Sequence, residues 1–376
     1  MTGIRILADD LTGALDTAAA FSGKVPVYID RPPPVSESGG DQPVSVVATP
    51  TRDVAVEALA RFLEPVLDWF VSGRMSFKKV DSLLRGNTFE EIAWLCRQGG
   101  FERVLFAPAF PAQGRITSDD RQWVVRPGLD REAVAVPLRG AFARLGLRSG
   151  AALDDGADVW IPEVATDGDL DRAVMQAEAV KSDVMWVGSA GLGNALARRF
   201  GLSPQSGSAS PLVRSAGPTV LVSASFQPVF REQWALLRAS RSARVVAEAG
   251  DAEQIGGAIE LTRSGAGEAW FDLSPRETIS AEQAAIRLES NTRILAERLP
   301  KPGQLIVVGG DTLLGLCRAC GATGLLAHPS IRQGWGCARI MGGAWDGVPC
   351  YSRSGAFGTA DDLVALYGAL SHTTSC

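Results

Sequence analysis

Carboxylate and guanidinium side chains stand at short spacing in two segments of the N-terminal half. Asp9 and Asp10 are neighbours, and Asp81 precedes Arg85 and Asn87 in one short stretch. An arginine fork suits a carboxylate or a phosphate, while aspartate and asparagine suit sugar hydroxyls. Together these residue types fit a small polyhydroxy acid as ligand.

A plain structural interpretation also exists for each segment. Asp9 and Asp10 can satisfy free N–H groups at a helix N-terminus. Asp81 and Arg85 can form an ordinary ion pair beside an asparagine helix cap at position 87. Both segments nevertheless follow strands, which favours the ligand interpretation.

Short apolar runs, typical of buried parallel strands, precede both segments. Residues 4–8 lead into Asp9 and Asp10, and residues 75–80 lead into Asp81. In open α/β sheets, ligands bind at the carboxyl ends of the strands. We therefore expect the two acidic segments to share a ligand crevice.

The alternation of strands and helices predicts a doubly wound α/β fold with a largely parallel sheet. Apolar runs indicate the strands, and helical spacing or turn residues indicate the helices between them. Residues 116–156 show no clear pattern. The expected strands cover 4–8, 25–29, 44–48, 75–80, 104–107 and 184–187, and the expected helices cover 15–21, 54–71 and 88–98.

A weaker signal follows the strand expected at 104–107. Gln113 and Arg115 lie there in a proline-containing stretch. Taken alone, this stretch is more typical of a turn with an exposed arginine. It follows a strand, however, as the two acidic segments do.

The length of 376 residues is too great for one small core and favours two domains. Residues 202–217 are rich in Ser, Pro and Gly and form the best linker candidate. We predict one α/β domain over residues 1–205, a linker over 206–217 and a second α/β domain over 218–376.

Glycines and hydroxyls, rather than charges, follow the strands expected in the second half. Gly309 and Gly310 permit close backbone approach, and Thr312 stands near a helix N-terminus that favours phosphate. Residues 354–358 repeat the pattern. The chain has no Walker-type Gly-x-x-x-x-Gly-Lys-Ser/Thr and no Gly-x-Gly-x-x-Gly after its first strand, so support for a nucleotide from these residues is modest.

Composition limits the classes of function. The net charge of −5 gives no basic footprint for nucleic acid, although an anionic substrate remains compatible with it. We expect no membrane partner, because no apolar run reaches transmembrane length and no secretory leader is present. Only two histidines, His328 and His372, are present, so acid–base work falls to carboxylates or lysine.

The six cysteines, among them Cys376, are scattered, which fits the reducing cytoplasm better than a disulfide framework. Cys317 and Cys320 form a Cys-x-x-Cys pair on an expected helix. They have no second pair and no nearby histidine in that element. We therefore expect buried thiols there rather than a zinc or redox site.

Seven segments occur in a recognisable order along nearly the whole chain. They are residues 8–14 (ADDLTGA), 79–87 (KVDSLLRGN), 108–115 (PAFPAQGR), 188–192 (GSAGL), Ser223 with Ser225, 309–312 (GGDT) and 353–358 (RSGAFG). This order resembles that of the four-carbon acid sugar kinase family. The resemblance implies an N-terminal acid-sugar domain, a C-terminal nucleotide domain and an active site in the interdomain cleft. It also implies ATP- and Mg²⁺-dependent phosphorylation of the terminal hydroxyl of threonate, erythronate or a 3-oxo-tetronate.

The resemblance further implies a catalytic set and two sets of contact residues. In the catalytic set, Arg85 holds the substrate carboxylate, and Asp10, or else Asp81, orients the hydroxyl and accepts its proton. Mg²⁺ bridges the phosphates, and the sequence identifies no ligand for it. The substrate set is Asp9, Asp10, Thr12, Lys79, Asp81, Ser82, Arg85, Asn87, Gln113 and Arg115. The ATP set is Ser225, Gly309, Gly310, Asp311, Thr312, Gly334, Trp335, Gly336, Cys337, Arg353, Ser354 and Gly355.

Three positions depart from the family pattern. Arg353 replaces the usual lysine, and Leu83 replaces a threonine and its hydroxyl. Phe226 ends a Ser-Ala-Ser-Phe stretch where the family has Gly-Ser-Cys-Ser. A kinase of a small sugar acid is still expected, and a homodimer is left open. A branched relative such as 3-oxo-isoapionate stands beside the tetronates as a candidate substrate.

Two other functions are alternatives. A haloacid-dehalogenase-like sugar phosphatase also begins with a strand, Asp and Thr. That family needs a second Asp two places after the first, where this chain has Leu11 after Asp9. A non-catalytic acid-sugar sensor would keep the first domain and bind ATP without producing ADP.

Overall fold

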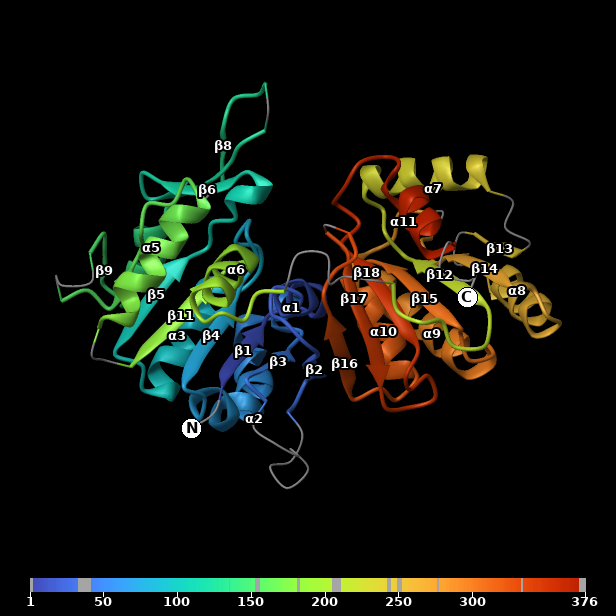
Figure 1. The fold of residues 1–376 in the computed structure, drawn as a ribbon, viewed down its shortest axis with the longest axis horizontal. Helices are drawn as coiled ribbons and strands as arrows, with labels where there is room; N and C mark the ends of the chain where they lie inside the picture. Colours follow the sequence, from blue (N-terminus) through green and yellow to red (C-terminus); the bar gives the residue numbers. More distant parts are fainter. Residues whose placement is uncertain are drawn as a thin grey trace. The chain divides into compact units, whose positions relative to one another are not determined.

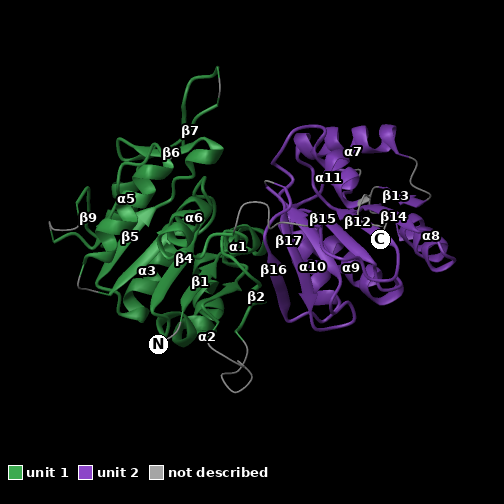
Figure 2. Ribbon diagram, viewed as in Figure 1, with its two compact units in different colours: residues 1–205 green, residues 206–376 purple. Residues whose placement is uncertain are grey.

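The chain folds into two compact units, residues 1–205 and 206–376 (Figures 1 and 2). The computed structural model describes residues 3–32, 42–126, 128–134, 136–152, 156–180, 183–204, 211–241, 245–248, 252–275, 277–332 and 334–371. His372, Cys376 and residues 205–210 of the expected linker region lie outside the described residues. In the described part, no helix combines the length and hydropathy needed to span a bilayer.

The first unit is built on a parallel sheet whose strands run in the order β2-β3-β1-β4-β11-β5-β10-β9 (Figure 1). Strands lie on both sides of β1, as in doubly wound folds, with β3 between β1 and β2 and β11 between β4 and β5. The strands are β1 (Ile4–Ala8), β2 (Val25–Ile29), β3 (Val44–Ala48), β4 (Met75–Lys79), β5 (Arg103–Ala107), β9 (Ser149–Gly150), β10 (Val159–Trp160) and β11 (Val184–Gly188).

Helices cover both faces of this sheet. On one side α1, α6 and α5 pack next to one another, and on the other α2, α3 and α4 do so. Their bounds are α1 (Leu11–Ala18), α2 (Leu59–Val71), α3 (Thr88–Gly99), α4 (Leu138–Arg144), α5 (Asp167–Glu178) and α6 (Ala190–Arg199). Short 3₁₀ turns precede α2 and follow β5, namely η1 (Thr51–Asp53), η2 (Val56–Ala58) and η3 (Pro111–Gln113).

The predicted strands of this unit agree with the observed ones to within one residue. The first helix was placed too late, because α1 begins at Leu11 rather than at residue 15. Asp10 caps it, so the helix starts directly after the acidic pair. Helix α2 begins at Leu59, later than the predicted residue 54, because the turns η1 and η2 come first. The unassigned stretch 116–156 contains α4 and an antiparallel sheet of β6 (Arg115–Ser118), β7 (Arg121–Val124) and β8 (Glu132–Ala133).

The second unit has a mixed sheet in the order β13-β14-β12-β15-β18-β17-β16. The first five strands are parallel, while β17 is antiparallel to both of its neighbours. The strands are β12 (Thr219–Ser223), β13 (Val245–Ala247), β14 (Glu268–Asp272), β15 (Gln304–Val308), β16 (Gly324–His328), β17 (Gly336–Met341) and β18 (Pro349–Arg353). The helices are α7 (Pro228–Ser240), α8 (Ala252–Arg263), α9 (Ala281–Arg298), α10 (Gly310–Ala319) and α11 (Asp362–Ser371).

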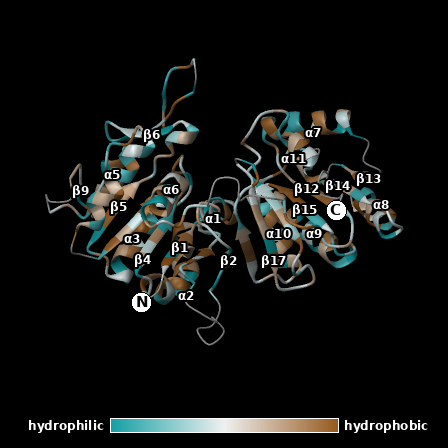
Figure 3. Ribbon diagram, viewed as in Figure 1, coloured by the Kyte–Doolittle hydropathy of each residue, from teal (hydrophilic) through white to brown (hydrophobic). Residues whose placement is uncertain are grey.

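Each unit buries its own apolar core between sheet and helices. Figure 3 shows hydrophobic residues concentrated along the strands. In the first unit Phe89, Phe106 and Phe142 pack edge to face or tilted, and in the second Trp234 and Trp270 do the same. These cores hold the strand ends rigidly, which is what a precise polar site requires.

Candidate functional site

The strands of the first unit end at one level, so the segments that follow them share one edge of the sheet. Ala48, Ala8, Lys79 and Gly188 are register partners on four adjacent strands, and Ala107 continues the row on β5. The polar segments after these strands therefore come together, although they are far apart in the sequence.

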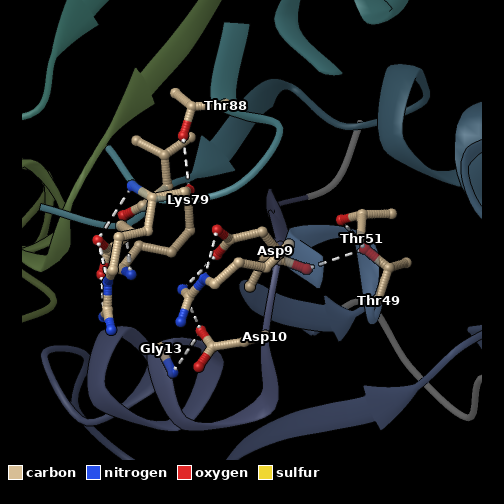
Figure 4. Close-up of polar contacts among 12 residues, drawn as sticks. Asp9, Asp10, Gly13, Thr49, Thr51, Lys79 and Thr88 are labelled. Atoms are coloured by element: carbon tan, nitrogen blue, oxygen red, sulfur yellow. Dashed lines mark hydrogen bonds and ion pairs between the residues drawn. The ribbon is translucent and has the colours of Figure 1, made fainter. Parts of the chain in front are cut away.

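Asp9 and Asp10 share one guanidinium, that of Arg52. Nε of Arg52 donates to Oδ2 of Asp9 at 3.0 Å, and Nη2 donates to Oδ1 of Asp9 at 2.9 Å and to Oδ1 of Asp10 at 2.8 Å (Figure 4). Asp9 is only 2% exposed, so the fork neutralises a carboxylate that would be costly to bury alone. Burial alone would lower the pKa of Arg52, but the two carboxylates outweigh it and raise that pKa.

Arg52 is a site residue that sequence reasoning missed. It lies in η1, directly after β3, in the polar stretch Thr49-Pro50-Thr51-Arg52. That position after a buried strand was the available signal. Its partner Asp9 lies 43 residues away, and only the pairing of β1 with β3 brings the two together.

The first turn of α1 makes room for the ammonium of Lys79. Oδ1 of Asp10 accepts the N–H of Gly13 at 3.0 Å and caps the helix. A Cβ at position 13 would lie 2.4 Å from that Oδ1 and 2.7 Å from Nζ of Lys79, so only glycine permits this approach. Nζ also donates to the carbonyl of Val80 at 3.1 Å. Lys79 thus places a positive charge beside Asp10 (Figure 4).

Asp81 and Arg85 form a bidentate ion pair. Nε and Nη2 of Arg85 donate to the two carboxylate oxygens of Asp81 at 2.8 and 2.7 Å. The backbone N–H of Leu83 donates to the same carboxylate at 3.1 Å. The Arg85 side chain is nevertheless half exposed, and among the described residues its Nη1 has no hydrogen-bond partner. One edge of this fork is therefore free for an anion.

The two carboxylates proposed as proton acceptors have opposite pKa shifts. Burial raises the pKa of Asp10 and outweighs the opposing charge of Arg52. Burial also acts upward on Asp81, but hydrogen bonds and the charge of Arg85 lower the pKa of Asp81 overall. A better proton acceptor is a carboxylate with a raised pKa, so Asp10 suits that role and Asp81 does not. Burial likewise raises the pKa of Asp16, a further carboxylate on α1, although the charge of Lys79 acts to lower it.

Asn87 and Ser82 support neighbouring turns in the described structure. Nδ2 of Asn87 donates to the carbonyls of Thr51 and Val54, both at 2.8 Å, and so holds the turn that carries Arg52. Nε2 of the buried Gln122 donates to the carbonyl of Ser82 at 2.9 Å. The side chain of Ser82 is half-buried. Gln122 was not predicted, and it ties the small antiparallel sheet to the strand-end edge.

Arg115 faces the Asp81–Arg85 pair from the start of β6. Burial lowers its pKa, and the charge of Asp81 acts in the opposite direction. Nη1 of Arg115 donates to the carbonyl of Gln113, and within the described part of the chain its buried Nε has no hydrogen-bond partner. The buried hydroxyl of Thr12 likewise has no partner among the described residues. Arg115 thus adds a third guanidinium to the charges near Asp81.

The second unit also ends several strands at one level. Ser223, Val308 and Arg353 are register partners on β12, β15 and β18, and Gly336 of β17 is paired with Ser352. The predicted ATP residues begin at these positions. Unlike those of the first unit, they present mainly backbone and hydroxyl groups.

Close backbone contact joins the segments after β12, β15 and β18. A Cβ at position 355 would lie 2.1 Å from Oγ of Ser225, so the two segments touch because residue 355 is glycine. The N–H of Gly309 donates to the carbonyl of Arg353 at 2.9 Å. Helix α10 then begins at Gly310, with Asp311 exposed in its first turn. Thr312, by contrast, is buried.

Arg353 is buried beneath residues 354–358 rather than exposed beside them. Its guanidinium is buried, with Nη1 3.1 Å from Oδ2 of Asp362 and Cζ 5.0 Å from the ring centroid of Trp335. Arg332 binds the other oxygen of Asp362 at 2.7 Å. A Cβ at position 358 would collide with the same guanidinium. The buried guanidinium of Arg353 therefore packs against residues 354–358 and stabilises their conformation.

Only the two glycines of the predicted turn at residues 334–337 belong to this strand-end edge. Gly334 adopts a positive φ of 78°, and Gly336 opens β17. The side chains of Trp335 and Cys337 instead belong to the apolar core. Burial raises the pKa of the Cys337 thiol to about 12, so this thiol is unreactive.

An exposed aromatic side chain follows Ser225. Phe226 is 57% exposed, and Cζ of Arg231 lies 5.7 Å from its ring centroid. Arg231 in turn pairs with Asp272 at 2.6 Å and donates to Oγ of Ser274 at 2.5 Å. Sequence reasoning missed Arg231 and Asp272, although Asp272 also ends a strand.

No group of three or more His, Cys, Asp or Glu side chains in the described ranges is arranged to hold a metal ion. Cys317 and Cys320 are buried free thiols, as expected, and burial raises the pKa of both.

Comparison with known proteins extends these observations. The family model described as a sugar-binding N-terminal domain matches residues 4–141. D-threonate kinase of Cupriavidus necator is 26% identical, with 98% of each chain covered. D-erythronate kinase of Heliobacterium modesticaldum is 23% identical, covering 96% of this chain and 95% of the relative.

A solved structure shows the same fold. It is a protein from Salmonella typhimurium LT2 with a TM-score of 0.77 and 20% identity, covering 97% of this chain and 99% of that one. The likeness to the two kinases spans nearly the whole of each chain, and the matched N-terminal model covers the carboxylate–guanidinium edge. The resemblance seen in the motifs is thus confirmed: the chain is similar over nearly its whole length to D-threonate and D-erythronate kinases, and its N-terminal part matches the sugar-binding domain model.

Proposed function

We propose that this protein is an ATP-dependent kinase that phosphorylates the terminal hydroxyl of a small sugar acid of the threonate, erythronate or 3-oxo-tetronate type. The observation that carries the proposal is the set of carboxylates and guanidinium groups at one edge of the first unit. Such a set can bind both the carboxylate and the hydroxyls of a polyhydroxy acid. The names of the two relatives agree with that ligand class.

The free donor of Arg85 supplies the anion site. Its side chain is half exposed, its Nη1 has no hydrogen-bond partner among the described residues, and Arg115 belongs to the same charge cluster. We assign the substrate carboxylate to Arg85, with Arg115 beside it. Asp9 is already neutralised by Arg52, so its role is to hold that arginine in place.

Asp10 is the proposed proton acceptor. Both of its hydrogen bonds use Oδ1, which leaves Oδ2 without a partner among the described residues. Its pKa is raised mainly by burial, which favours proton transfer from a hydroxyl. Phosphoryl transfer otherwise depends chiefly on positioning and on charge neutralisation.

The nucleotide is assigned to the second unit, which we propose as the nucleotide domain (residues 218–376) beside an acid-sugar domain (1–205). Gly309, Gly310 and Gly355 give phosphate oxygens close access to backbone N–H groups. Phe226 offers an exposed ring for the nucleobase. Mg²⁺ would bind mainly phosphate oxygens and water, as it does in many kinases, and Asp311 offers an exposed carboxylate in the first turn of α10.

The test is a coupled ADP-release screen over D-threonate, D-erythronate, their stereoisomers, 3-oxo-tetronates and 3-oxo-isoapionate. We expect ADP release with one narrow group of acids and none without acid. Failure of every acid, with ATP still bound, would favour a sensor. Phosphate release from a sugar phosphate without ATP would instead favour a phosphatase.

A further inference from the structure

A buried ion pair lies inside the core of the first unit. Nζ of Lys78, on β4, is 2.7 Å from Oε2 of Glu91, on α3, and both side chains are almost completely buried. Such a pair is weak evidence for stability, because apolar residues of similar volume often serve as well or better. A second role therefore has to explain why charges occupy this position.

Neighbouring lysines of β4 face opposite sides of the sheet, since side chains alternate along a strand. Lys79 lies beside α1 and Asp10. Lys78 points to the other face, where its register partners Leu7 and Val187 belong to the apolar core packed under α3. The sheet thus separates Lys78 from Lys79 and α1, and the charge of Lys78 meets Glu91 instead.

Glu91 connects this pair to the turn that carries Arg52. Oγ1 of Thr51 donates to Oε2 of Glu91 at 2.8 Å, and it lies 3.1 Å from Oγ1 of Thr49. All three side chains are buried. Thr51 directly precedes Arg52, so a continuous series of polar contacts runs from Lys78 to the turn η1.

The N-terminus of helix α3 makes a second set of contacts with the same turn. Asn87, at its start, donates to the carbonyls of Thr51 and Val54, while the N–H of Glu91 donates to the carbonyl of Asn87 at 2.9 Å. The turn is thereby fixed through both its backbone and a buried hydroxyl. Little freedom remains for the residue that follows Thr51.

We propose that Lys78 and Glu91 are positioning residues that fix η1 and thereby aim the Arg52 guanidinium at Asp9 and Asp10. Glu91 acts through Thr51, and Lys78 holds the Glu91 carboxyl group in place through its 2.7 Å contact. Neither residue touches substrate. The activity readout of this inference rests on the proposed kinase function, although the geometry does not.

The double variant Lys78→Met/Glu91→Leu tests the proposal. We expect an unfolding midpoint in urea equal to or above that of the wild type, because an apolar pair replaces a buried ionic one. We expect kcat/KM for the preferred sugar acid to fall about tenfold or more, because a misplaced group is costly in a positioned site. KM for ATP should not change. Wild-type kcat/KM in a folded double variant would overturn the proposal.

Thr51→Val supplies a second, milder variant that removes only the hydroxyl link. Ser76→Ala is its matched control, since Ser76 lies on the same strand and face as Lys78, is buried, and donates to the carbonyl of Phe70 at 2.8 Å. Thr51→Val should lower kcat/KM severalfold, and Ser76→Ala should not. Equal behaviour of the two variants would contradict the proposal, and this comparison decides it if the double variant does not fold.

A crystal structure of Thr51→Val gives a readout without activity. The proposal requires a displaced or disordered Arg52, and an unchanged bidentate contact between Arg52 and Asp9 would overturn it. A wild type that phosphorylates no sugar acid would contradict the proposed function alone. An active wild type with an unaffected double variant would contradict only the positioning role.

Discussion

The two strand-end edges of this protein are built from different chemical groups. In the first unit, side chains supply the polar surface as two guanidinium–carboxylate sets, Arg52 with Asp9 and Asp10, and Arg85 with Asp81. In the second unit, glycine backbone and hydroxyl groups supply the polar surface. Arg353, at the end of β18, is buried beneath this surface and pairs with Asp362.

Under the proposed function, this difference suits the two edges to two kinds of anion. A small acid offers few atoms, so its recognition needs charges fixed in direction, and bidentate pairs provide that. A polyphosphate is larger and is bound well by many N–H groups, which glycine exposes. Changes to side-chain charge should therefore damage the first edge, and changes to backbone access should damage the second.

Asp10→Asn should have the largest effect. Asparagine also caps helices, so α1 should form normally and the variant should fold. Loss of the proton acceptor should reduce kcat by about 10²–10⁴, measured by steady-state ADP release. Near-wild-type kcat in this variant would remove Asp10 from the role.

The same assignment has a pH signature. The pKa of Asp10 is raised above 3.8 chiefly by burial. A carboxyl group that accepts a proton in the reaction must start ionised. kcat/KM should thus rise with pH through a value above 3.8 and level off. Asp10→Asn should flatten this limb, whereas an unchanged limb would assign it to another group.

Gly355→Ala should come next. The new Cβ would lie 2.1 Å from Oγ of Ser225, so the segments after β12 and β18 must separate. We expect KM for ATP to rise about tenfold or more, with the affinity for the sugar acid unchanged by calorimetry. Gly257→Ala is the control, because a Cβ there meets nothing within 4 Å. Equal effects on both ligands would contradict the assignment of the edges.

Phe226→Ala tests whether the second edge binds the nucleobase of ATP by stacking. Stacking of a base on an aromatic ring contributes about 1–3 kcal/mol, so the affinity for ATP should fall by the corresponding factor. Inorganic tripolyphosphate has no base and should bind equally well to both forms. Phe226→Tyr should retain ATP affinity, and ATP binding unaffected by Phe226→Ala would exclude a stacking role.

Arg353→Lys replaces the buried fork by the residue that the family usually has. The fork contacts both Asp362 and Trp335, and a lysine cannot reproduce both contacts. We expect about 1–2 kcal/mol lower stability in urea unfolding, with a smaller change in KM for ATP. A large change in KM for ATP at unchanged stability would show that Arg353 meets phosphate directly.

Asp81→Asn should lower stability modestly at neutral pH, and its difference from the wild type should shrink in acid. The folded-state pKa of Asp81 lies below 3.8, because the bonds from Arg85 outweigh burial. Its ionic contribution to stability is therefore fully present above pH 3.8 and is lost as pH falls through the lower folded value. The wild type should lose more stability than Asp81→Asn between pH 4 and 2 in urea titrations, and parallel curves would contradict this.

Much of the scaffold was predictable from local patterns. Short apolar runs ended at the observed strands, and the acidic and glycine segments after them were found by residue type alone. The start of α1 was missed because the capping role of Asp10 competes with its interpretation as a loop ligand. Residues 116–156 were missed because a small antiparallel sheet has too few residues per strand for a clear period.

The sequence by itself determined which residues follow each strand, because strand formation and turn chemistry depend on neighbours in the chain. Only the tertiary structure decided partners: Arg52 with Asp9, Lys78 with Glu91, and Arg353 buried beneath its glycine segment. Those choices depend on which strands become adjacent and which face of each is covered. Both arise from packing between residues far apart in the sequence, and a linear pattern does not contain them.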